Sequence, residues 1–134
     1  MPDEWSTGSV RGIERGQRFE PAASSVRAAR DFVAVALQDA GYEGDWDAVL
    51  LLVSELATNA VRHAATPYEI VIDAGIGRVR VAVIDGDGAN PPQLQDPTPD
   101  DTNGRGLLIV DELAARWGSD LVGADNKAVW FTLS

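Results

Sequence analysis

One helical stretch in the middle of the chain places three polar side chains on a single face of an otherwise apolar helix. Residues 54–64 read Ser-Glu-Leu-Ala-Thr-Asn-Ala-Val-Arg-His-Ala, which sets Glu55, Asn59 and His63 four residues apart. Because an α-helix turns once in about 3.6 residues, side chains at this spacing lie above one another. An acid, an amide and an imidazole therefore share one face, and the apolar residues between them predict a buried stripe.

Two long amphipathic helices are predicted in the first half of the chain, over residues 22–40 and 45–65. In both, apolar side chains recur at the spacing of a helix with one buried face. Gly41 is the expected C-cap of the first helix, because glycine accepts the left-handed conformation that ends many helices. Asp45 is the expected N-cap of the second helix, because its carboxylate can accept hydrogen bonds from the free N–H groups of the first turn.

Short runs of apolar residues predict the strands of one sheet. The expected strands are residues 17–20, 68–74, 78–84, 120–122 and 127–133, the first of them at an edge of the sheet. A third helix is expected over residues 106–117. With residues 1–16 as a flexible lead-in, residues 17–134 then form one α+β domain. We expect a two-layer α/β sandwich, with a mixed and mostly antiparallel sheet covered on one face by helices.

Composition excludes several classes of function. A length of 134 residues suits one domain with a real core. The net charge of −10 argues against binding to duplex nucleic acid or to an anionic membrane surface. The absence of cysteine excludes disulfides and thiolate metal sites, and the single histidine cannot build a multi-histidine zinc site. No apolar run reaches the roughly 20 residues of a membrane span and no signal peptide is recognisable, so a cytoplasmic protein is the simplest interpretation.

The pair Glu55 and Asn59 suits phosphoryl transfer. A carboxylate can accept a proton from an attacking hydroxyl group or water. An amide oxygen is a hard, neutral ligand for Mg²⁺, which takes its other ligands from waters and phosphates. The alternative is a solvated polar face with no chemistry. His63 extends the same face and could contact a phosphate, hydrogen-bond an acid or simply be solvated.

Two glycine-containing segments follow downstream. Asp85-Gly86-Asp87-Gly88 ends an apolar strand, where a carboxylate could accept a hydrogen bond from an exocyclic amine such as that of adenine; a plain turn aspartate is the alternative. Gly104-Arg105-Gly106-Leu107 opens the third expected helix, whose free N–H groups could bind phosphate; a flexible junction is the alternative. Residues 86–103 between them contain four prolines and four aspartates but no lysine or arginine, which predicts a long functional loop.

These three segments together resemble the GHKL ATPase superfamily, whose nucleotide site is called the Bergerat fold. The run Glu-Leu-Ala-Thr-Asn-Ala from Glu55 is similar to the N box of that superfamily, and it continues well through His63. The segments that begin at Asp85 and at Gly104 occupy the places of its G1 and G2 boxes. The small size, residues 51–56 and the closing strand 127–133 are most similar to the anti-sigma-factor serine/threonine kinases and their actinobacterial ATP-binding relatives.

The resemblance implies a role for each residue of the site. Glu55 is expected to be the general base, Asn59 the Mg²⁺ ligand, and Asp85 the residue that recognises the amino group of adenine. The loop 86–103 is expected to be the ATP lid, with phosphate contacts at its hinge. The remaining expected ATP-binding residues are His63, Gly88, Gly104, Arg105, Gly106 and Leu107. ATP and Mg²⁺ are the expected cofactors.

The resemblance also implies partners. In the anti-sigma branch, the kinase phosphorylates a serine or threonine of an anti-anti-sigma (STAS-type) protein and sequesters a sigma factor, often as a homodimer. Asp87 stands where the G1 box usually has glycine, and the lid is acidic. These departures favour a second hypothesis, a partner-switching binding module with a degenerate nucleotide site. A histidine-kinase ATPase module is disfavoured as a complete enzyme, because the only histidine lies inside the N box.

Overall fold

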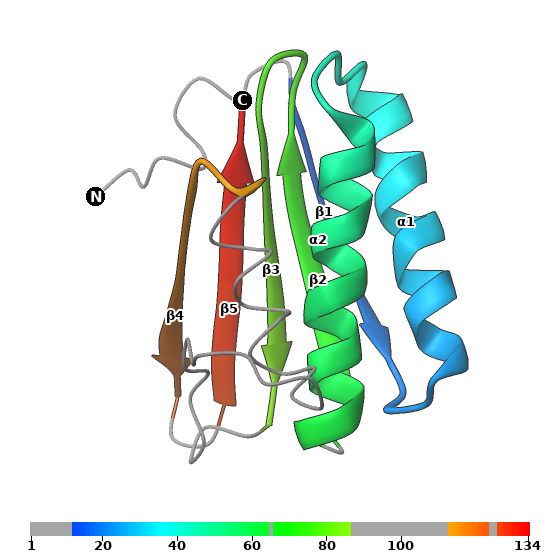
Figure 1. The fold of residues 1–134 in the computed structure, drawn as a ribbon, viewed down its shortest axis with the longest axis vertical. Coiled ribbons are helices and arrows are strands. Elements are labelled where there is room, and N and C mark those ends of the chain that lie inside the picture. The colour runs from blue at the N-terminus through cyan, green and yellow to red at the C-terminus, as the bar shows by residue number, and fades with distance from the viewer. Residues whose placement is uncertain (1–11, 65, 87–112, 124–125) are drawn as a thin grey trace.

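The computed structural model describes residues 12–64, 66–86, 113–123 and 126–134 of the chain. Within these residues the chain forms two α-helices, one π-helical turn and one five-stranded sheet. The elements are, in chain order, β1 (Ile13–Phe19), α1 (Ser24–Ala40), α2 (Trp46–Asn59), η2 (Ala60–Ala64), β2 (Tyr68–Ala74), β3 (Val79–Asp85), β4 (Arg116–Val122) and β5 (Asn126–Leu133). Figure 1 shows the helices in one layer and the sheet in the other, so the predicted two-layer α+β fold is confirmed.

The order of strands across the sheet differs from their order along the chain. The sheet runs β1-β2-β3-β5-β4, and each neighbouring pair is antiparallel. The last strand, β5, is therefore inserted between β3 and β4 (Figure 1). This insertion matters for function, because it brings the start of β5 next to the end of β3, where the sequence predicts a recognition aspartate.

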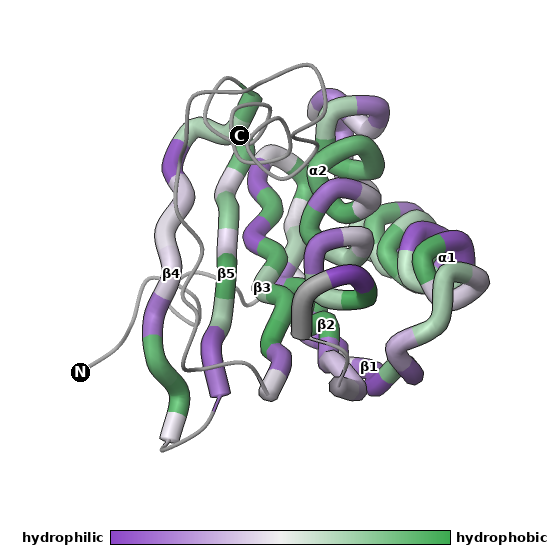
Figure 2. Tube along the Cα trace, turned by 60° about the horizontal axis from the view of Figure 1, so that its bottom comes forward, coloured by the Kyte–Doolittle hydropathy of each residue, from purple (hydrophilic) through white to green (hydrophobic). Residues whose placement is uncertain are grey.

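Both α-helices pack on the same face of the sheet (Figure 2). The core between the layers consists of alternate strand residues and the apolar stripes of α1 and α2. Its largest fully buried side chains are Tyr68, Phe131, Leu37, Leu52, Ile70, Ile72, Val33, Val49, Val53, Val79 and Val81. Burial of these apolar surfaces is the main force that holds α2 against β3, and this contact forms the walls of the site described below.

The helix ends follow the predicted local chemistry. Gly41 ends α1 in the left-handed conformation, with φ of 68°, and its N–H bonds to the carbonyl of Gln38. Asp45 is the N-cap of α2, and its carboxylate accepts a hydrogen bond from the N–H of Ala48 at 3.0 Å. These two caps set the short connection between the helices and so fix where α2 begins.

The last turn of the predicted second helix is not α-helical. At Asn59 the α-helix gives way to the π-helical turn η2, which contains His63. π-Helical turns are rare and occur often at functional sites. The change of geometry lies at one wall of the pocket described below, directly after the residue predicted to bind Mg²⁺.

Two strands begin several residues earlier than predicted. β1 begins at Ile13 instead of Gln17, so part of the predicted lead-in is sheet. β4 begins at Arg116, so the predicted end of the third helix is wrong at Arg116 and Trp117. The reason is pairing with β5, in which Trp117 lies opposite Phe131 and Gly118 opposite Trp130. A side chain at Gly118 would begin 2.8 Å from the Trp130 indole, so glycine lets this ring lie against the strand.

The remainder of the third predicted helix, residues 106–112, and most of the predicted lid lie outside the described residues. Leu113 is helical, and β4 then begins at Arg116. In the part of the chain that the structure describes, no helix is long and apolar enough to cross a membrane.

Candidate functional site

Asp85 is the last residue of β3 and points toward the helix layer. It follows the core residues Val79, Val81 and Val83 at every second position, and only 4% of its surface is exposed. The two-residue period of a strand places all four side chains on the same face. The alternating pattern of β3 therefore places the Asp85 carboxylate in the protein interior, where a charged group needs partners.

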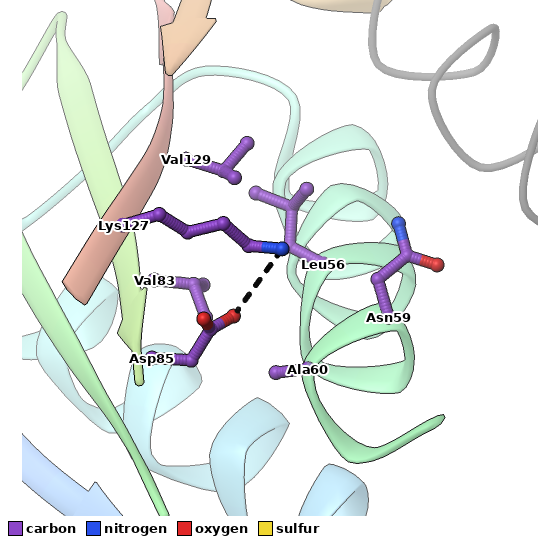
Figure 3. A pocket seen from close by; sticks show the side chains of 7 residues that line it. All are labelled: Leu56, Asn59, Ala60, Val83, Asp85, Lys127 and Val129. Atoms are coloured by element: carbon purple, nitrogen blue, oxygen red, sulfur yellow. Dashed lines mark ion pairs between the residues drawn. The ribbon is translucent and has the colours of Figure 1, made fainter. Parts of the chain in front are cut away.

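Lys127, on the neighbouring strand β5, forms an ion pair with Asp85. The two residues lie opposite one another in the β3–β5 register. The Lys127 Nζ atom is 3.9 Å from the Asp85 Oδ2 atom, and 8% of the lysine surface is exposed. Figure 3 shows the lysine side chain reaching along the pocket toward the carboxylate. From the sequence, Lys127 is predicted only as a strand residue, and its contact with Asp85 is not foreseen.

A small pocket opens between the end of α2 and the ends of β3 and β5. Its cavity volume is about 30 Å³, and the empty space amounts to about 300 Å³ when the adjoining open solvent is included. Its walls come from α2 and η2 on one side and from the two strands on the other (Figure 3). The residues that line it are Leu56, Asn59, Ala60, Val83, Asp85, Lys127 and Val129. An apolar cleft with a few convergent polar groups is the usual form of a small-molecule site.

The pocket brings together two residues that the sequence analysis singled out independently. Asn59 ends α2 and lines the pocket, as does Asp85 at the end of β3. Packing of the α2 stripe on the sheet causes this convergence. The predicted Mg²⁺ ligand and the predicted adenine-recognition residue thus belong to one cavity.

Glu55 lies one helical turn before Asn59 on the same face of α2. Its side chain is half-buried, and it is not among the residues that line the pocket. Burial raises the pKa of the Glu55 carboxyl above its ordinary value of 4.5, because a desolvated carboxylate is less stable than the neutral acid. A carboxyl group with a raised pKa is a stronger base once it is ionised, which suits the predicted role.

The other predicted ATP-binding residues are only partly placed. The backbone of His63 belongs to η2, directly after the wall of the pocket. Gly88, Gly104, Arg105, Gly106 and Leu107 lie outside the described residues, as does Asp87. Their predicted contacts with the nucleotide stay predictions.

A hydrogen bond that the sequence analysis missed fixes the chain next to Asp85. The N–H of Gly86 donates to the Thr66 Oγ1 atom at 2.9 Å. A side chain at Gly86 would begin 3.1 Å from the same hydroxyl oxygen, so the close approach uses the small size of glycine. Thr66 follows η2, and the bond therefore ties the end of the helical wall to the end of the strand wall.

The donor set of the pocket suits a nucleotide with Mg²⁺ better than a metal ion held by protein groups alone. Among residues 12–64, 66–86, 113–123 and 126–134, no three His, Cys, Asp or Glu side chains gather as a metal site. The single amide of Asn59 can supply one oxygen to Mg²⁺, which commonly takes its other ligands from phosphates and water. At the other end of the pocket, Asp85 accepts hydrogen bonds and Lys127 donates them.

Comparison with known proteins agrees with this geometry. The family described as histidine kinase-like ATPase domain matches residues 19–133. No curated protein matches the chain. Among solved structures, the fold is similar to the crystal structure of the RsbU and RsbW domains of Rv1364c from Mycobacterium tuberculosis, with a TM-score of 0.64 and 20% sequence identity. The similarity covers 90% of this chain and 32% of that chain, so it shows a shared fold with one part of a longer protein.

The residues that match the family include most of the elements that the structure describes. The matched residues contain both helices, the pocket and strands β2 to β5, but only the last residue of β1, Phe19. The match therefore agrees with the GHKL resemblance of the three sequence motifs. Because it spans most of the sequence, the chain belongs to the histidine kinase-like ATPase domain family.

Proposed function

We propose that the chain binds Mg-ATP in the pocket between α2 and β3 and transfers the terminal phosphate to a serine or threonine of an anti-anti-sigma protein. The observation that carries this proposal is the convergence of Asn59 and Asp85 on one pocket from two different elements. Each was assigned to the nucleotide from its own motif. One pocket lined by both residues supports a single ligand, which carries its nucleobase at one end and its phosphates with Mg²⁺ at the other.

Each residue has a distinct part in the proposed binding. Asp85 accepts a hydrogen bond from the amino group of adenine at the buried end of the pocket. The amide oxygen of Asn59 holds Mg²⁺, whose chemistry is to neutralise the phosphate charge. His63, Gly88, Gly104, Arg105, Gly106 and Leu107 complete the proposed contacts around the phosphates and the lid. Helix N-termini opened by glycine are suited to phosphate binding, because their N–H groups are free.

Glu55 is the proposed base for the transfer step. It accepts the proton of the attacking hydroxyl as the oxygen of that hydroxyl bonds to the terminal phosphorus and the bond from phosphorus to the bridging oxygen of ADP breaks. Its half-buried place one turn before Asn59 keeps the carboxylate near the phosphate end of the site. Its raised pKa increases its basicity in the ionised form.

The proposed partners are an anti-anti-sigma (STAS-type) protein as phosphate acceptor and a sigma factor that the chain sequesters, with a homodimer as the proposed assembly in the cytoplasm. The fold similarity to the RsbU and RsbW domains of a mycobacterial protein supports this branch of the family. The net charge of −10 favours protein partners over duplex nucleic acid.

A second function is favoured by a specific observation in the same pocket. The Asp85 carboxylate is paired with Lys127, and Asp87 replaces the usual G1 glycine. A nucleotide that has to displace Lys127 from Asp85 in order to bind would bind weakly. The chain would then act as a partner-switching binding module in which the nucleotide site is degenerate.

Calorimetric titration with ATP and ADP, with and without Mg²⁺, separates the two functions. We expect Mg²⁺-dependent binding of ATP in the micromolar range, about −8 kcal/mol. Asn59→Ala should abolish Mg²⁺-dependent binding and leave the fold intact, because it removes the amide ligand. Gln38→Ala is the matched control, since Gln38 is an exposed amide on α1 away from the pocket.

Two results would contradict the proposal. No heat of binding at millimolar ATP with Mg²⁺ would mean that the pocket does not take the nucleotide, and would leave the binding module as the function. Unchanged affinity in Asn59→Ala would remove Asn59 as the Mg²⁺ ligand. Circular dichroism of both variants shows that any loss of binding is not a loss of fold.

A further inference from the structure

Lys127 brings a second charged group into the end of the pocket that is proposed to receive adenine. Both Lys127 and Asp85 are largely withdrawn from solvent. Their side chains line the same pocket and point toward one another (Figure 3). A buried ammonium group is costly unless it is paired, so its place in a ligand pocket calls for an explanation beyond strand formation.

The sheet register fixes where the lysine points. Asp85 lies opposite Lys127, and two residues further in Val83 lies opposite Val129. Side chains of paired residues share a face of the sheet, so all four face α2. The two valines, Leu56 and Ala60 line the same pocket as the charged pair. The pairing of β3 with β5 therefore fixes the position of Lys127 in the pocket.

The pair places a hydrogen-bond donor group beside an acceptor group. At 3.9 Å, the separation of Nζ and Oδ2 exceeds the length of a hydrogen bond. An ammonium group has three N–H donors, and a carboxylate has about four acceptor positions. Each group thus has capacity for more than one partner. The two together present an acceptor next to a donor.

We infer that Lys127 is a specificity-determining residue, which donates a hydrogen bond to the ring nitrogen N1 of adenine while Asp85 accepts one from the 6-amino group. This inference rests on the proposed ATP site. The Watson–Crick edge of adenine carries a donor, the amino group, next to an acceptor, N1, and so is complementary to an acceptor beside a donor. Guanine carries a carbonyl oxygen at position 6 and an N–H at position 1, which in the same orientation places an acceptor against Asp85 and a donor against Lys127.

Nucleotide analogues test each of the two hydrogen bonds on the unmodified protein. The first analogue is 1-deaza-ATP, in which a C–H replaces N1, and the second is purine riboside triphosphate, which lacks the amino group. We expect calorimetry to show 1-deaza-ATP binding ten- to a hundredfold more weakly than ATP, as for the loss of a hydrogen bond to a charged group. Purine riboside triphosphate and GTP should be weakened as well.

The variant Lys127→Met separates a direct contact from a general effect of the ring change. Methionine keeps much of the length of the side chain and removes the donor. We expect Lys127→Met to bind ATP as weakly as the unmodified protein binds 1-deaza-ATP, and to show little further loss with 1-deaza-ATP. The preference for ATP over purine riboside triphosphate should remain, because that preference depends on Asp85.

Three outcomes overturn the inference, and each differs from a failure of the proposed function. Equal binding of ATP and 1-deaza-ATP to the unmodified protein would show that Lys127 does not read N1, whether or not the variant folds. Tighter ATP binding by Lys127→Met would show that the lysine competes with adenine for Asp85. GTP binding as tight as ATP would remove the selectivity. By contrast, the absence of ATP binding to the unmodified protein would overturn the ATP site itself.

Discussion

At the scale of single residues, burial changes the acid–base behaviour of Glu55. Burial of the Glu55 carboxyl raises its pKa above the ordinary 4.5, so the neutral acid persists to a higher pH than in an exposed glutamate. Between the ordinary pKa and the raised one, the folded protein binds more protons at Glu55 than the unfolded chain does. The contribution of Glu55 to the free energy of unfolding therefore falls as the pH rises through this window.

The rate of phosphate transfer should follow the ionisation of Glu55. If Glu55 is the proposed base, transfer from γ-labelled ATP to the proposed anti-anti-sigma acceptor should fall as the pH is lowered through the raised pKa, because only the carboxylate can accept the proton. Glu55→Gln should keep ATP affinity and lose transfer by roughly 10²- to 10⁴-fold, the usual worth of a general base. Glutamine has no carboxyl to titrate, so the residual rate should lose this pH dependence.

The stability of the same variant gives an independent readout. Glutamine carries no charge to desolvate, so the free energy of unfolding of Glu55→Gln at neutral pH should equal or exceed that of the unmodified protein. The difference should shrink as the pH falls below the ordinary glutamate pKa. Full transfer activity in Glu55→Gln would show that another group is the base.

At the scale of elements, the caps determine where α2 begins and thereby help to place Asn59 and Glu55. The Asp45 carboxylate accepts a hydrogen bond from the Ala48 N–H. We expect Asp45→Ala to lower the free energy of unfolding by about 1 kcal/mol, within a range of about 0.5–2 kcal/mol for loss of an N-cap. Urea unfolding followed by circular dichroism measures this change.

Asp45→Asn is the matched control for this prediction. The asparagine amide oxygen can accept the same hydrogen bond but carries no charge, and asparagine is about as good an N-cap as aspartate. It should therefore keep most of the stability. An equal loss in Asp45→Asn and Asp45→Ala would show that the charge of Asp45 matters and that the cap hydrogen bond does not.

The elements also show which parts of the fold the sequence could predict. The caps at Gly41 and Asp45 depend on local chemistry, and both predictions are confirmed. The strand at residues 68–74 was predicted with the bounds that the structure has, because its apolar alternation is strong. The early start of β4 could not be predicted in this way, since it depends on the Trp130 ring that covers Gly118 from another strand.

The same distinction applies to the site. Asn59 and Asp85 were predicted because each lies in a recognisable motif, and the structure places both in one pocket. The pairing of Lys127 with Asp85 was missed because it depends on the β3–β5 register, which no local pattern encodes. A lysine at the start of an otherwise apolar closing strand was the one available signal. The π-helical turn after Asn59 was missed as well, because its residues continue the helical pattern.

At the scale of the whole molecule, strand order and helix cover give the middle of the sheet and its β4 edge different environments. β2 and β3 each pair with a strand on both sides, and Ile70, Ile72 and Val81 are fully buried beneath the helices. Within the described residues β4 pairs with β5 alone, and 65% of the Leu121 surface is exposed. Amide protection depends on such pairing and burial, so stability is expected to vary across the sheet.

Hydrogen–deuterium exchange measured by mass spectrometry tests this gradient and the placement of the nucleotide together. We expect peptides from β2 and β3 to exchange only by global unfolding, over the longest times, and peptides from β4 to exchange much earlier through local opening. Addition of Mg-ATP should slow exchange at the end of α2, in η2 and at the start of β5, because these segments form or adjoin the walls of the pocket. Peptides from α1 serve as an internal control, since α1 supplies no residue to the pocket lining. Protection of β4 equal to that of β2 would contradict the gradient, and an ATP effect confined to α1 would move the nucleotide away from Asp85 and Asn59.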